Sequence, residues 1–375
     1  MVMNETLYTM ALTRLSGIGL MPVLELYKRV GSAQTIFEHK DDIRQIVPDA
    51  ANRLVESLRY SNEAIEKAKR EQEFAVKHNI QCLCFNDEAY PQRLRQCDDA
   101  PIILFYKGNA HLNQKKIISI VGTRHCTQYG KDLVGKFLSS LTCYCPDVLV
   151  VSGLAYGIDI ASHRAALKNG YDTIGVLAHG LDQIYPSSHR DTAIEMLSHG
   201  GLLTEYMSQT NADKQNFVAR NRIVAGISDA TIVIESAARG GSLITASIAQ
   251  GYHRDVFAFP GNVFSESSAG CNNLIRDNAA ALINNAEDFI HAMKWDDEQI
   301  RNQRQTLGIE RTMFPEFTEE EQIIVNILSK QNDQQLNTLS VTSNLSISKI
   351  TAILFELEMK GVVKLLAGGV YHLLN

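Results

Sequence analysis

The regular alternation of strand-like runs with helical stretches between residues 117 and 260 restricts the fold of this 375-residue chain more than any other feature. Most of the runs are continuous apolar or β-branched segments, as expected for parallel strands that are covered on both faces. The runs are IISIV (117–121), VLVVS (148–152), TIGVL (173–177), LLTEY (202–206), ATIVIE (230–235) and DVFAFP (255–260). The helical stretches between them are Tyr129–Leu141, Ile158–Lys168, His189–Ser198, Phe217–Ala225 and Ser242–Tyr252. This pattern predicts an α/β fold built on an open, doubly wound, mostly parallel sheet.

The segment before this alternation is helical. Residues 5–70 show the helical spacing of apolar side chains, and Gly17 and Gly19 form a tight turn between two of these helices. The turn resembles a helix-hairpin-helix element, which holds a phosphate on backbone N–H groups, although glycine serves purely structural turns more often. A connecting segment follows, in which IILFY (102–106) is expected to be a short strand.

The C-terminal part of the chain differs again. After Trp295 the stretch DDEQIRNQRQTLGIERTMFPEF is typical of a linker, and from Phe317 onward three helices precede a hairpin around Gly368 and Gly369, the pattern of a winged helix. Because this part is acidic (FTEEEQ), we expect it to contact a protein or to regulate the chain rather than to read duplex DNA. The expected domains are 1–75 (helical), 76–295 (α/β), 296–316 (linker) and 317–375 (winged helix).

The charge of the chain limits where a negatively charged ligand can bind. A net charge of −6 argues against a coat of positive charge over the whole surface, but it is compatible with a focused basic groove. From Ile117 to Trp295 the charges nearly cancel, whereas the later part is acidic. A site for a polyanion is therefore expected in the middle of the chain.

The sequence shows no pattern of an exported or membrane protein. The N-terminus MVMNETLYTM lacks a basic segment followed by a long apolar run, and no apolar stretch approaches the length that spans a bilayer. The seven cysteines lack the usual structural-zinc spacing, and reduced thiols explain them simply. We therefore expect a cytoplasmic protein without a membrane segment, a metal or another cofactor.

The stretch KQNFVARNR places Lys214, Arg220 and Arg222 around one aromatic residue, Phe217. Cations beside a flat ring suit a ligand that carries both phosphates and bases. Stacking on an aromatic side chain contributes about 1–3 kcal/mol per base and requires an unpaired base. A single-stranded nucleic acid is therefore the first ligand to consider, while an ordinary surface loop that leads into a helix stays an open alternative.

Glycine-rich loops follow two of the predicted strands. In an open α/β sheet, ligands bind beyond the carboxyl ends of the strands. The loop GTRHCTQYG places Gly122 and Arg124 there, and SGLAYGID places Ser152, Gly153 and Gly157 there. Glycine turns that lead into helices form anion sites from N–H groups and the helix dipole. Neither loop is a Walker sequence, and neither fits G-x-G-x-x-G.

Later loops add polar residues to the same edge of the sheet. They are Ser242 and Thr245 in GGSLITA, Pro260 and Gly261 in FPGN, and Asn272, Asn273 and Arg276 in GCNNLIRDNA. Each loop by itself fits ordinary helix capping, but the convergence of several on one edge favours a phosphate site. In contrast, we expect Asp159 to cap its helix and His163 to pack against the sheet.

No catalytic signature stands out in the sequence. A Ser-His-Asp order, HExxH, closely spaced metal ligands and paired-carboxylate motifs are not found. Glu235, at the end of a strand, is a possible acid or base, but no partner for it is evident. The expected site holds phosphates and has nothing apparent to cleave them.

With these residues assembled, the chain closely resembles the DNA-processing protein A (DprA) family, also called Smf, over nearly its full length. The resemblance rests on LSGIG, YPQRL…IILFYKG, SIVGTRHCTQYG, VVSGLAYGIDIASH, GLDQIYP, NFVARNRIVAG, GGSLITA, FAFPG and GCNNLIRDNA. It implies an N-terminal helical SAM-like or helix-hairpin-helix domain, an extended Rossmann domain and a C-terminal winged helix. It further implies a non-enzymatic, generally dimeric protein that binds and protects single-stranded DNA and loads the recombinase RecA in natural transformation.

The resemblance also implies roles for individual residues. Arg124 would grip a backbone phosphate, and Phe217 would stack on a base. Lys214 would line the same groove together with Arg220 or Arg222. The loop Gly153–Gly157 and the segment Asn272–Arg276 would complete the floor, and the full set of expected DNA-binding residues is Gly122, Thr123, Arg124, Ser152, Gly153, Gly157, Lys214, Asn216, Phe217, Arg220, Asn221, Arg222, Ser242, Asn272, Asn273 and Arg276.

Two other functions stay open. A nucleotide-processing enzyme that resembles the phosphoribohydrolases would share a Rossmann-like sheet and glycine turns, with Glu235 acting on the sugar. Against it, their PGGxGT…E signature is absent, and ARGGSLITA offers no equivalent carboxylate. A pure protein scaffold is the third possibility, but it would leave the arginines exposed for no evident reason.

Overall fold

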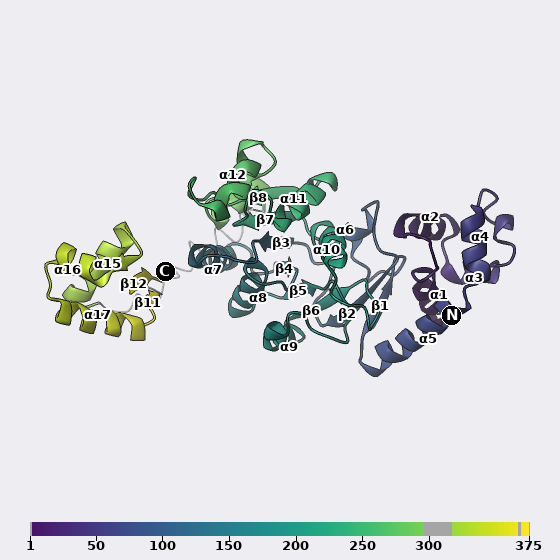
Figure 1. Ribbon diagram of the computed structural model, residues 1–375, viewed down its shortest axis with the longest axis horizontal. Coiled ribbons are helices and arrows are strands. Elements are labelled where there is room, and N and C mark those ends of the chain that lie inside the picture. The colour runs from purple at the N-terminus through teal and green to yellow at the C-terminus, as the bar shows by residue number, and fades with distance from the viewer. Residues whose placement is uncertain (1, 296–316, 367–368, 375) are drawn as a thin grey trace, which may run out of the picture. The chain divides into compact units, whose positions relative to one another are not determined.

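The computed structural model describes residues 2–295, 317–366 and 369–374 (Figure 1). The chain divides into two compact units, Met1–Trp295 and Asp296–Asn375. The predicted linker 296–316 and Gly368 of the predicted hairpin lie outside the described residues. In the described parts of the chain, no helix is long and apolar enough to cross a membrane.

The first unit contains a nine-stranded sheet, counted over the described residues, in the order β1-β2-β6-β5-β4-β3-β7-β8-β9 (Figure 1). Strands β3 to β9 run parallel to one another, whereas β1 and β2 join one edge as antiparallel strands. The bounds are β1 Gln81–Cys84, β2 Ile103–Gly108, β3 Ile117–Gly122, β4 Leu149–Ser152, β5 Thr173–Val176, β6 Gly200–Thr204, β7 Ala230–Ile234, β8 Asp255–Ala258 and β9 Ala281–Leu282. All six predicted runs form strands, so the prediction of a doubly wound, mostly parallel sheet is confirmed.

Helices cover both faces of this sheet. One face carries α7 and α8, and the other carries α10 and α11, as the ribbon views show (Figure 1). Strand β3 shows why both faces are covered, because its side chains alternate between two apolar clusters. Ile118 and Ile120 lie in the cluster that includes Phe137 of α7. Val121 lies in the cluster that includes Ile223 of α10. The helices of this part are α6 Gln92–Arg95, α7 Gln128–Thr142, α8 Ile158–Lys168, η2 Ser187–His189, α9 Arg190–Met196, α10 Lys214–Ile227, α11 Gly241–Gly251, η3 Glu266–Ser268, α12 Ala269–Arg276 and α13 Ala286–Met293.

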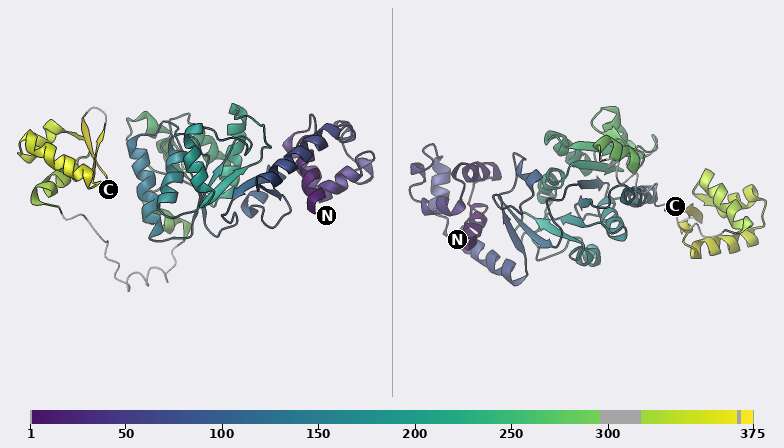
Figure 2. Two further views of the ribbon diagram at one scale, coloured as in Figure 1. Left: turned by 90° about the horizontal axis from the view of Figure 1, so that it is seen from below. Right: turned by 180° about the vertical axis from the view of Figure 1, so that it is seen from behind.

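The N-terminal helices gather at the edge of the sheet formed by β1 (Figure 2). They are α1 Val2–Leu12, α2 Leu20–Val30, α3 Ala33–Glu38, η1 Ile43–Gln45, α4 Asn52–Arg59 and α5 Asn62–Lys77. The predicted tight turn lies between α1 and α2, where Gly17 has a left-handed φ of +71°. Helix α5 continues across the expected domain boundary at residue 75, and that boundary stays a prediction.

One acidic side chain orders these N-terminal helices. The Glu5 carboxylate accepts hydrogen bonds from the backbone N–H groups of Ala33 (2.7 Å) and Gln34 (3.0 Å) at the start of α3. Burial opposes ionisation of Glu5, but these backbone bonds hold its pKa below the ordinary value. The ionised carboxylate therefore ties α1 to the N-terminus of α3.

The second unit has the predicted winged-helix order. Its elements are α15 Glu319–Lys330, β10 Gln334–Gln335, α16 Leu336–Ser343, α17 Ile347–Met359, β11 Val363–Leu366 and β12 Val370–Leu373, with the strand order β10-β12-β11. Thr318 and Glu321 form a reciprocal capping box at the start of α15. The Glu321 carboxylate also receives a hydrogen bond from Lys360 Nζ at 2.7 Å, which fixes the end of α17 against α15.

Candidate functional site

The order in which the chain adds strands to the sheet reverses at strand β3. This strand pairs with β4 on one side and with β7 on the other, so the carboxyl ends of β3 and β7 form the topological switch point where α/β sheets bind ligands. A Cβ atom on Gly122 would lie 2.0 Å from the carbonyl oxygen of Ile234, so only glycine fits at this end of β3. The N–H of Thr123 donates to the carbonyl of Glu235 at 2.7 Å, which joins the loops that follow the two strands.

A cavity of about 560 Å³ opens at this point, and we name it the switch-point cavity. Its walls are the loops after β3 and β4 and the N-terminal turns of α10 and α11. Among its lining residues, Asp159 is the single acid. The expected DNA-binding residues that line it are Gly122, Thr123, Arg124, Gly153, Lys214, Phe217, Arg220, Asn221 and Ser242. Residues that are far apart in the chain therefore meet at the edge of the sheet where they were expected.

The ring of Phe217 lies between cations from two different segments. The guanidinium carbon of Arg124 is 4.9 Å from the centroid of this half-buried ring, and that of Arg220 is 5.9 Å away. The Tyr185 ring lies beside it, with a centroid separation of 5.8 Å. The exposed Lys214 begins the same helix. The expected cation–aromatic cluster is therefore present, but Arg124 supplies the nearer guanidinium.

Arg220 is a buried cation in the floor of the switch-point cavity. Its Nη1 donates to the carbonyl of Gly153 at 2.6 Å and also to that of Val176. Burial lowers the pKa of Arg220 to about 10, against the attraction of nearby Asp159, so its charge remains at neutral pH. Burial raises the pKa of Asp159 in turn, although Arg220 opposes this. A Cβ atom on Gly153 would lie 2.4 Å from Arg220 Nη2, so the glycine makes room for the guanidinium.

The structure corrects the expectation for Arg222. This side chain is buried and donates to Glu205 at 2.6 Å, and its Nε lies 3.7 Å from Asp99. It does not line the switch-point cavity. Residues two positions apart on a helix point to opposite sides, so Arg220 and Arg222 do not share a groove. Arg222 anchors α10 to the rest of the unit.

Other expected residues hold loops in place. Ser152 is buried, and its hydroxyl donates to the carbonyl of Ile120 at 2.6 Å. Asn216 donates to the carbonyl of Asn211 at 3.0 Å, next to the start of α10. Neither Ser152 nor Asn216 is among the residues that line the switch-point cavity.

The segment Asn272–Arg276 does not complete the floor of that cavity. Asn272 both donates to and accepts from the main chain of Gly261, at 3.1 Å in each case. Arg276 is exposed and pairs with its neighbour Asp277 at 2.8 Å. Neither these two residues nor Asn273 lines the cavity. Asn272 instead fixes the loop after β8, which contains Gly261.

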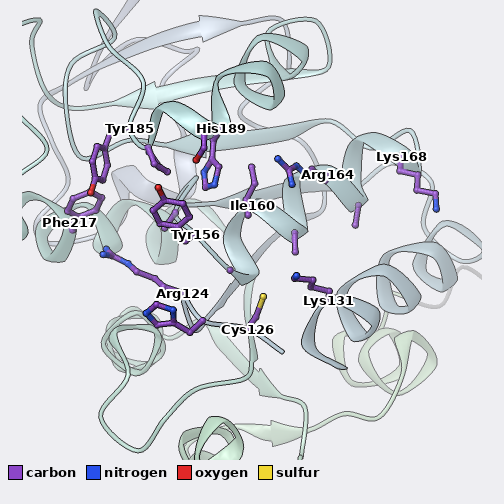
Figure 3. Close-up of a pocket in the computed structure, with 17 residues that line it drawn as sticks. Arg124, Cys126, Lys131, Tyr156, Ile160, Arg164, Lys168, Tyr185, His189 and Phe217 are labelled. Carbon is purple, nitrogen blue, oxygen red and sulfur yellow. The ribbon is translucent and has the colours of Figure 1, made fainter. Parts of the chain in front are cut away.

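A second cavity of about 970 Å³ lies beside the first, along helix α8, and we name it the α8 cavity (Figure 3). The two cavities share Arg124, Ala155 and Phe217. The expected residue Gly157 lines the α8 cavity with a left-handed φ of +78°. A Cβ atom there would lie 2.1 Å from the carbonyl oxygen of Thr123, so this glycine lets the loop after β4 touch the loop after β3.

The α8 cavity contains residues that the sequence reasoning missed. They are Lys131, Tyr156, Arg164, Lys168, Tyr185 and His189. Arg164 and Lys168 are spaced i,i+4 in the predicted helix 158–168, and this spacing was the one signal that could have placed them on one face. Lys131 and Tyr185 come from other segments and carry no local signal.

Glu235, which was considered for acid–base chemistry, is buried, as are His163 and Asp159, which were expected to be structural. The Glu235 carboxylate accepts from the N–H and the hydroxyl of Thr127, at 2.8 and 2.5 Å, and holds the start of α7. His163 is buried with Nδ1 2.7 Å from the Thr173 hydroxyl, as expected for packing against the sheet, and burial lowers its pKa to about 3. Asp159 accepts from the N–H of Ala155 at 3.4 Å, near the start of α8. No group of three or more metal-ligating side chains occurs within the described residues.

Comparison with protein families finds two matches. The family described as DNA recombination-mediator protein A matches residues 81–294, and the DprA winged helix domain matches residues 315–369. The chain is 40% identical to the DNA processing protein DprA of Streptococcus pneumoniae over 204 residues, which are 54% of this chain and 71% of that protein. It is 29% identical over 394 residues to Protein Smf of Synechocystis sp., and this match covers 97% of each chain.

Two solved structures extend this similarity to three dimensions. The X-ray structure of DNA processing protein A from Streptococcus pneumoniae has a TM-score of 0.64 and 32% identity, and the match covers 76% of this chain and 97% of that one. DNA processing protein A from Helicobacter pylori, whose structure was determined for its single-stranded DNA binding mode, has a TM-score of 0.52 and 30% identity. That match covers 57% of this chain and 95% of the other.

Proposed function

The chain belongs to the DNA recombination-mediator protein A family, and from this premise we propose that it binds single-stranded DNA at the switch-point cavity without catalysing a reaction on it. The similar protein from Helicobacter pylori is described for its single-stranded DNA binding mode, which supports the same ligand class here. In this proposal Arg124 and Lys214 contact phosphates, and Phe217 stacks on a base. Arg220 adds a fixed positive charge to the floor of the cavity.

The observation that supports this proposal best is the arrangement of Arg124. Its side chain is exposed and lies over the Phe217 ring, and within the described residues it forms neither an ion pair nor a hydrogen bond. A guanidinium that no carboxylate neutralises is available for a phosphate. The part of the Phe217 ring that lines the two cavities can stack on a base, but only on a base that is not already paired and stacked in a duplex.

A nucleotide-processing enzyme has less support. The two oxygens of Glu235, the candidate acid or base, accept hydrogen bonds from Thr127 at the start of α7. A general base must reach the proton that it abstracts, and these bonds commit the carboxylate to the helix instead. We therefore propose that the protein catalyses no reaction on a nucleotide. The test is incubation of the protein with nucleoside monophosphates, and release of free base would contradict the proposal.

We extend the proposal to the role that the family resemblance implies. The protein would protect incoming single-stranded DNA in the cytoplasm and load the recombinase RecA on it during natural transformation, and it would act as a homodimer. The acidic winged helix would contact a protein rather than DNA. Loading is measured as the rate of RecA filament formation on DNA that is covered by a single-strand binding protein, and sedimentation measures the oligomeric state.

A competition experiment tests the proposed ligand. A labelled single-stranded oligonucleotide is bound to the protein, and unlabelled single-stranded or duplex DNA of the same sequence is added while anisotropy is recorded. We expect the single strand to compete about tenfold better or more, because one stacked base alone contributes roughly 1–3 kcal/mol. Log affinity should fall with log salt by about 0.7 for each neutralised phosphate. Equal competition by duplex DNA would exclude the proposed mode of binding.

A further inference from the structure

The α8 cavity has a charge composition unlike that of the whole chain. Its lining includes the basic residues Arg124, Lys131, Arg164 and Lys168 and no Asp or Glu, although the chain has a net charge of −6. A cleft lined by one sign of charge focuses the electric field and concentrates ions of the opposite sign. The cavity is therefore suited to an anionic ligand.

The cations of this cavity are available to such a ligand. Lys131, Arg164 and Lys168 are exposed, and none of them forms an ion pair within the described residues. The Nε of Arg164 donates to the Thr192 hydroxyl at 3.2 Å, which orients the guanidinium. Within the described residues, neither of its Nη groups forms a hydrogen bond or an ion pair. Arg164 and Lys168 are spaced i,i+4, so they project from the same face of α8 as neighbouring cations.

Aromatic rings accompany these charges. Tyr156 and Tyr185 are each 48% exposed, and both line the α8 cavity. The Tyr185 ring lies beside the Phe217 ring at an interplanar angle of 56°, and Tyr156 is held edge-on against His189 at a centroid distance of 5.0 Å. The cavity therefore provides what a single strand needs, which is a row of cations for its backbone and rings for its bases.

The arrangement of these residues gives the direction of the path. Figure 3 shows Tyr185 and Phe217 at one end of the α8 cavity, and Lys131, Arg164 and Lys168 at the other. Tyr156 lies between the two ends, and the guanidinium of Arg124 lies beside Phe217. Since Arg124 and Phe217 also line the switch-point cavity, a strand that contacts this pair can enter either cavity.

We propose that single-stranded DNA continues from the switch-point cavity past Arg124 and Phe217 into the α8 cavity, where Lys131, Arg164 and Lys168 bind its next phosphates. This inference rests on the function proposed above and adds a second stretch of contacts to it. Tyr156 and Tyr185 offer stacking surfaces along this stretch. The consequence is a dependence on length: a short oligonucleotide fills the switch-point cavity only, whereas a longer one contacts both cavities.

The test compares oligothymidylates of about 4 and about 16 nucleotides, which bracket the lengths that single-strand binding folds cover. The variant Arg164→Ala/Lys168→Ala is compared with the wild type and with a matched control, Lys115→Ala/Lys136→Ala. The control removes the same charge from exposed positions outside both cavities. We expect the first variant to bind the short strand like the control and the long strand at least about tenfold more weakly. On the long strand its salt slope should fall by about 1.4, for two lost phosphate contacts.

The outcomes separate this inference from the proposed function. If Arg124→Ala weakens binding of both lengths but the α8 variant matches the control on the long strand, the second stretch does not exist. If the α8 variant weakens both lengths equally, its cations do not form a second stretch that only a longer strand reaches, and the inference is overturned as well. If the wild type fails to bind either length, the proposed function and this inference are both overturned. Fluorescence of the single tryptophan, Trp295, during urea unfolding checks that each variant is folded.

Discussion

The guanidinium carbon of Arg124 lies 4.9 Å from the ring centroid of Phe217, and these two side chains belong to the walls of both cavities. Arg124 follows strand β3, and Phe217 lies in the first turns of α10 on the opposite face of the sheet from α8. The fold thus joins a phosphate-binding group and a stacking group from separate segments.

Arg124→Ala should weaken binding of single-stranded DNA and also reduce its salt dependence. If the guanidinium neutralises one phosphate, the slope of log affinity against log salt should become shallower by about 0.7. Anisotropy titrations at several salt concentrations measure this slope. Arg276→Ala is the matched control, since Arg276 is exposed, pairs with Asp277 and lines neither cavity. An unchanged slope for Arg124→Ala would show that this residue does not contact the backbone.

Phe217→Ala should weaken binding without changing the salt slope, because the ring has no charge. We expect a loss of about 1–3 kcal/mol of binding free energy if one base stacks on the ring. Phe264→Ala provides the control: this side chain is 95% exposed and lies outside the lining of both cavities. Equal affinities for the two variants would remove Phe217 from the site.

Gly157→Ala should be more harmful than Gly170→Ala, although both glycines have a left-handed φ, of +78° and +76° respectively. A positive φ costs an alanine at least about 1–2 kcal/mol. Only at Gly157 does the added Cβ meet the Thr123 carbonyl, whereas nothing lies within 4 Å of it at Gly170. Urea unfolding and DNA titration should both show the difference. Identical stabilities would mean that the two loops can move apart without cost.

Arg222→Ala should destabilise the protein while the folded fraction keeps its affinity for DNA. Removal of Arg222 leaves the largely buried Glu205 without its partner, and removing one partner of a buried ion pair typically costs about 3–5 kcal/mol. The double variant Arg222→Met/Glu205→Gln should recover part of this stability, because the glutamine at position 205 carries no charge that needs a partner. A loss of DNA affinity in the stable double variant would instead return Arg222 to the binding site.

The stability of the first unit should fall in mildly acidic solution because of His163. Burial lowers its pKa from the ordinary 6.5 to about 3 in the folded chain, so between these values the unfolded chain binds more protons. Stability therefore falls as pH decreases through this window, by about 2 kcal/mol between about pH 7.5 and about pH 5 for one such group. Urea unfolding followed by Trp295 fluorescence measures the free energy at each pH.

His163→Gln should lose this part of the pH dependence, whatever its effect on stability at neutral pH. His199→Gln, at an exposed position, should keep it. If both variants show the pH dependence of the wild type, the titration of His163 is not its cause.

Much of the fold was predictable because buried strands and helices have regular patterns of apolar residues in the sequence. The strands β3 to β8 are covered on both faces, so their residues form continuous apolar runs that stand out from the helices. Strand β1 was missed, since Gln81–Cys84 is a short edge strand with an exposed first residue and little apolar contrast. The two-residue strand β9 gave no pattern either.

The candidate site was predictable where the backbone itself makes the contact. Gly122, Gly153 and Gly157 were recognised because a glycine at the end of a strand indicates a close approach of main chain. Side-chain direction was less accessible. Arg220 and Arg222 look equivalent in the sequence, yet one lies in the floor of the cavity and the other is bonded to Glu205.

The amino-acid sequence by itself determined the alternation of strands and helices, the glycine loops at the edge of the sheet and the cation–aromatic helix start around Phe217. Only the tertiary structure decided that Arg124 lies over that ring and that Lys131 and Arg164 share a cavity. The physical reason is that apolar periodicity reports which side of one element is buried, whereas a cavity depends on the order of strands in the sheet. That order brings the ends of β3, β4 and β7 together, and no local stretch of sequence records it.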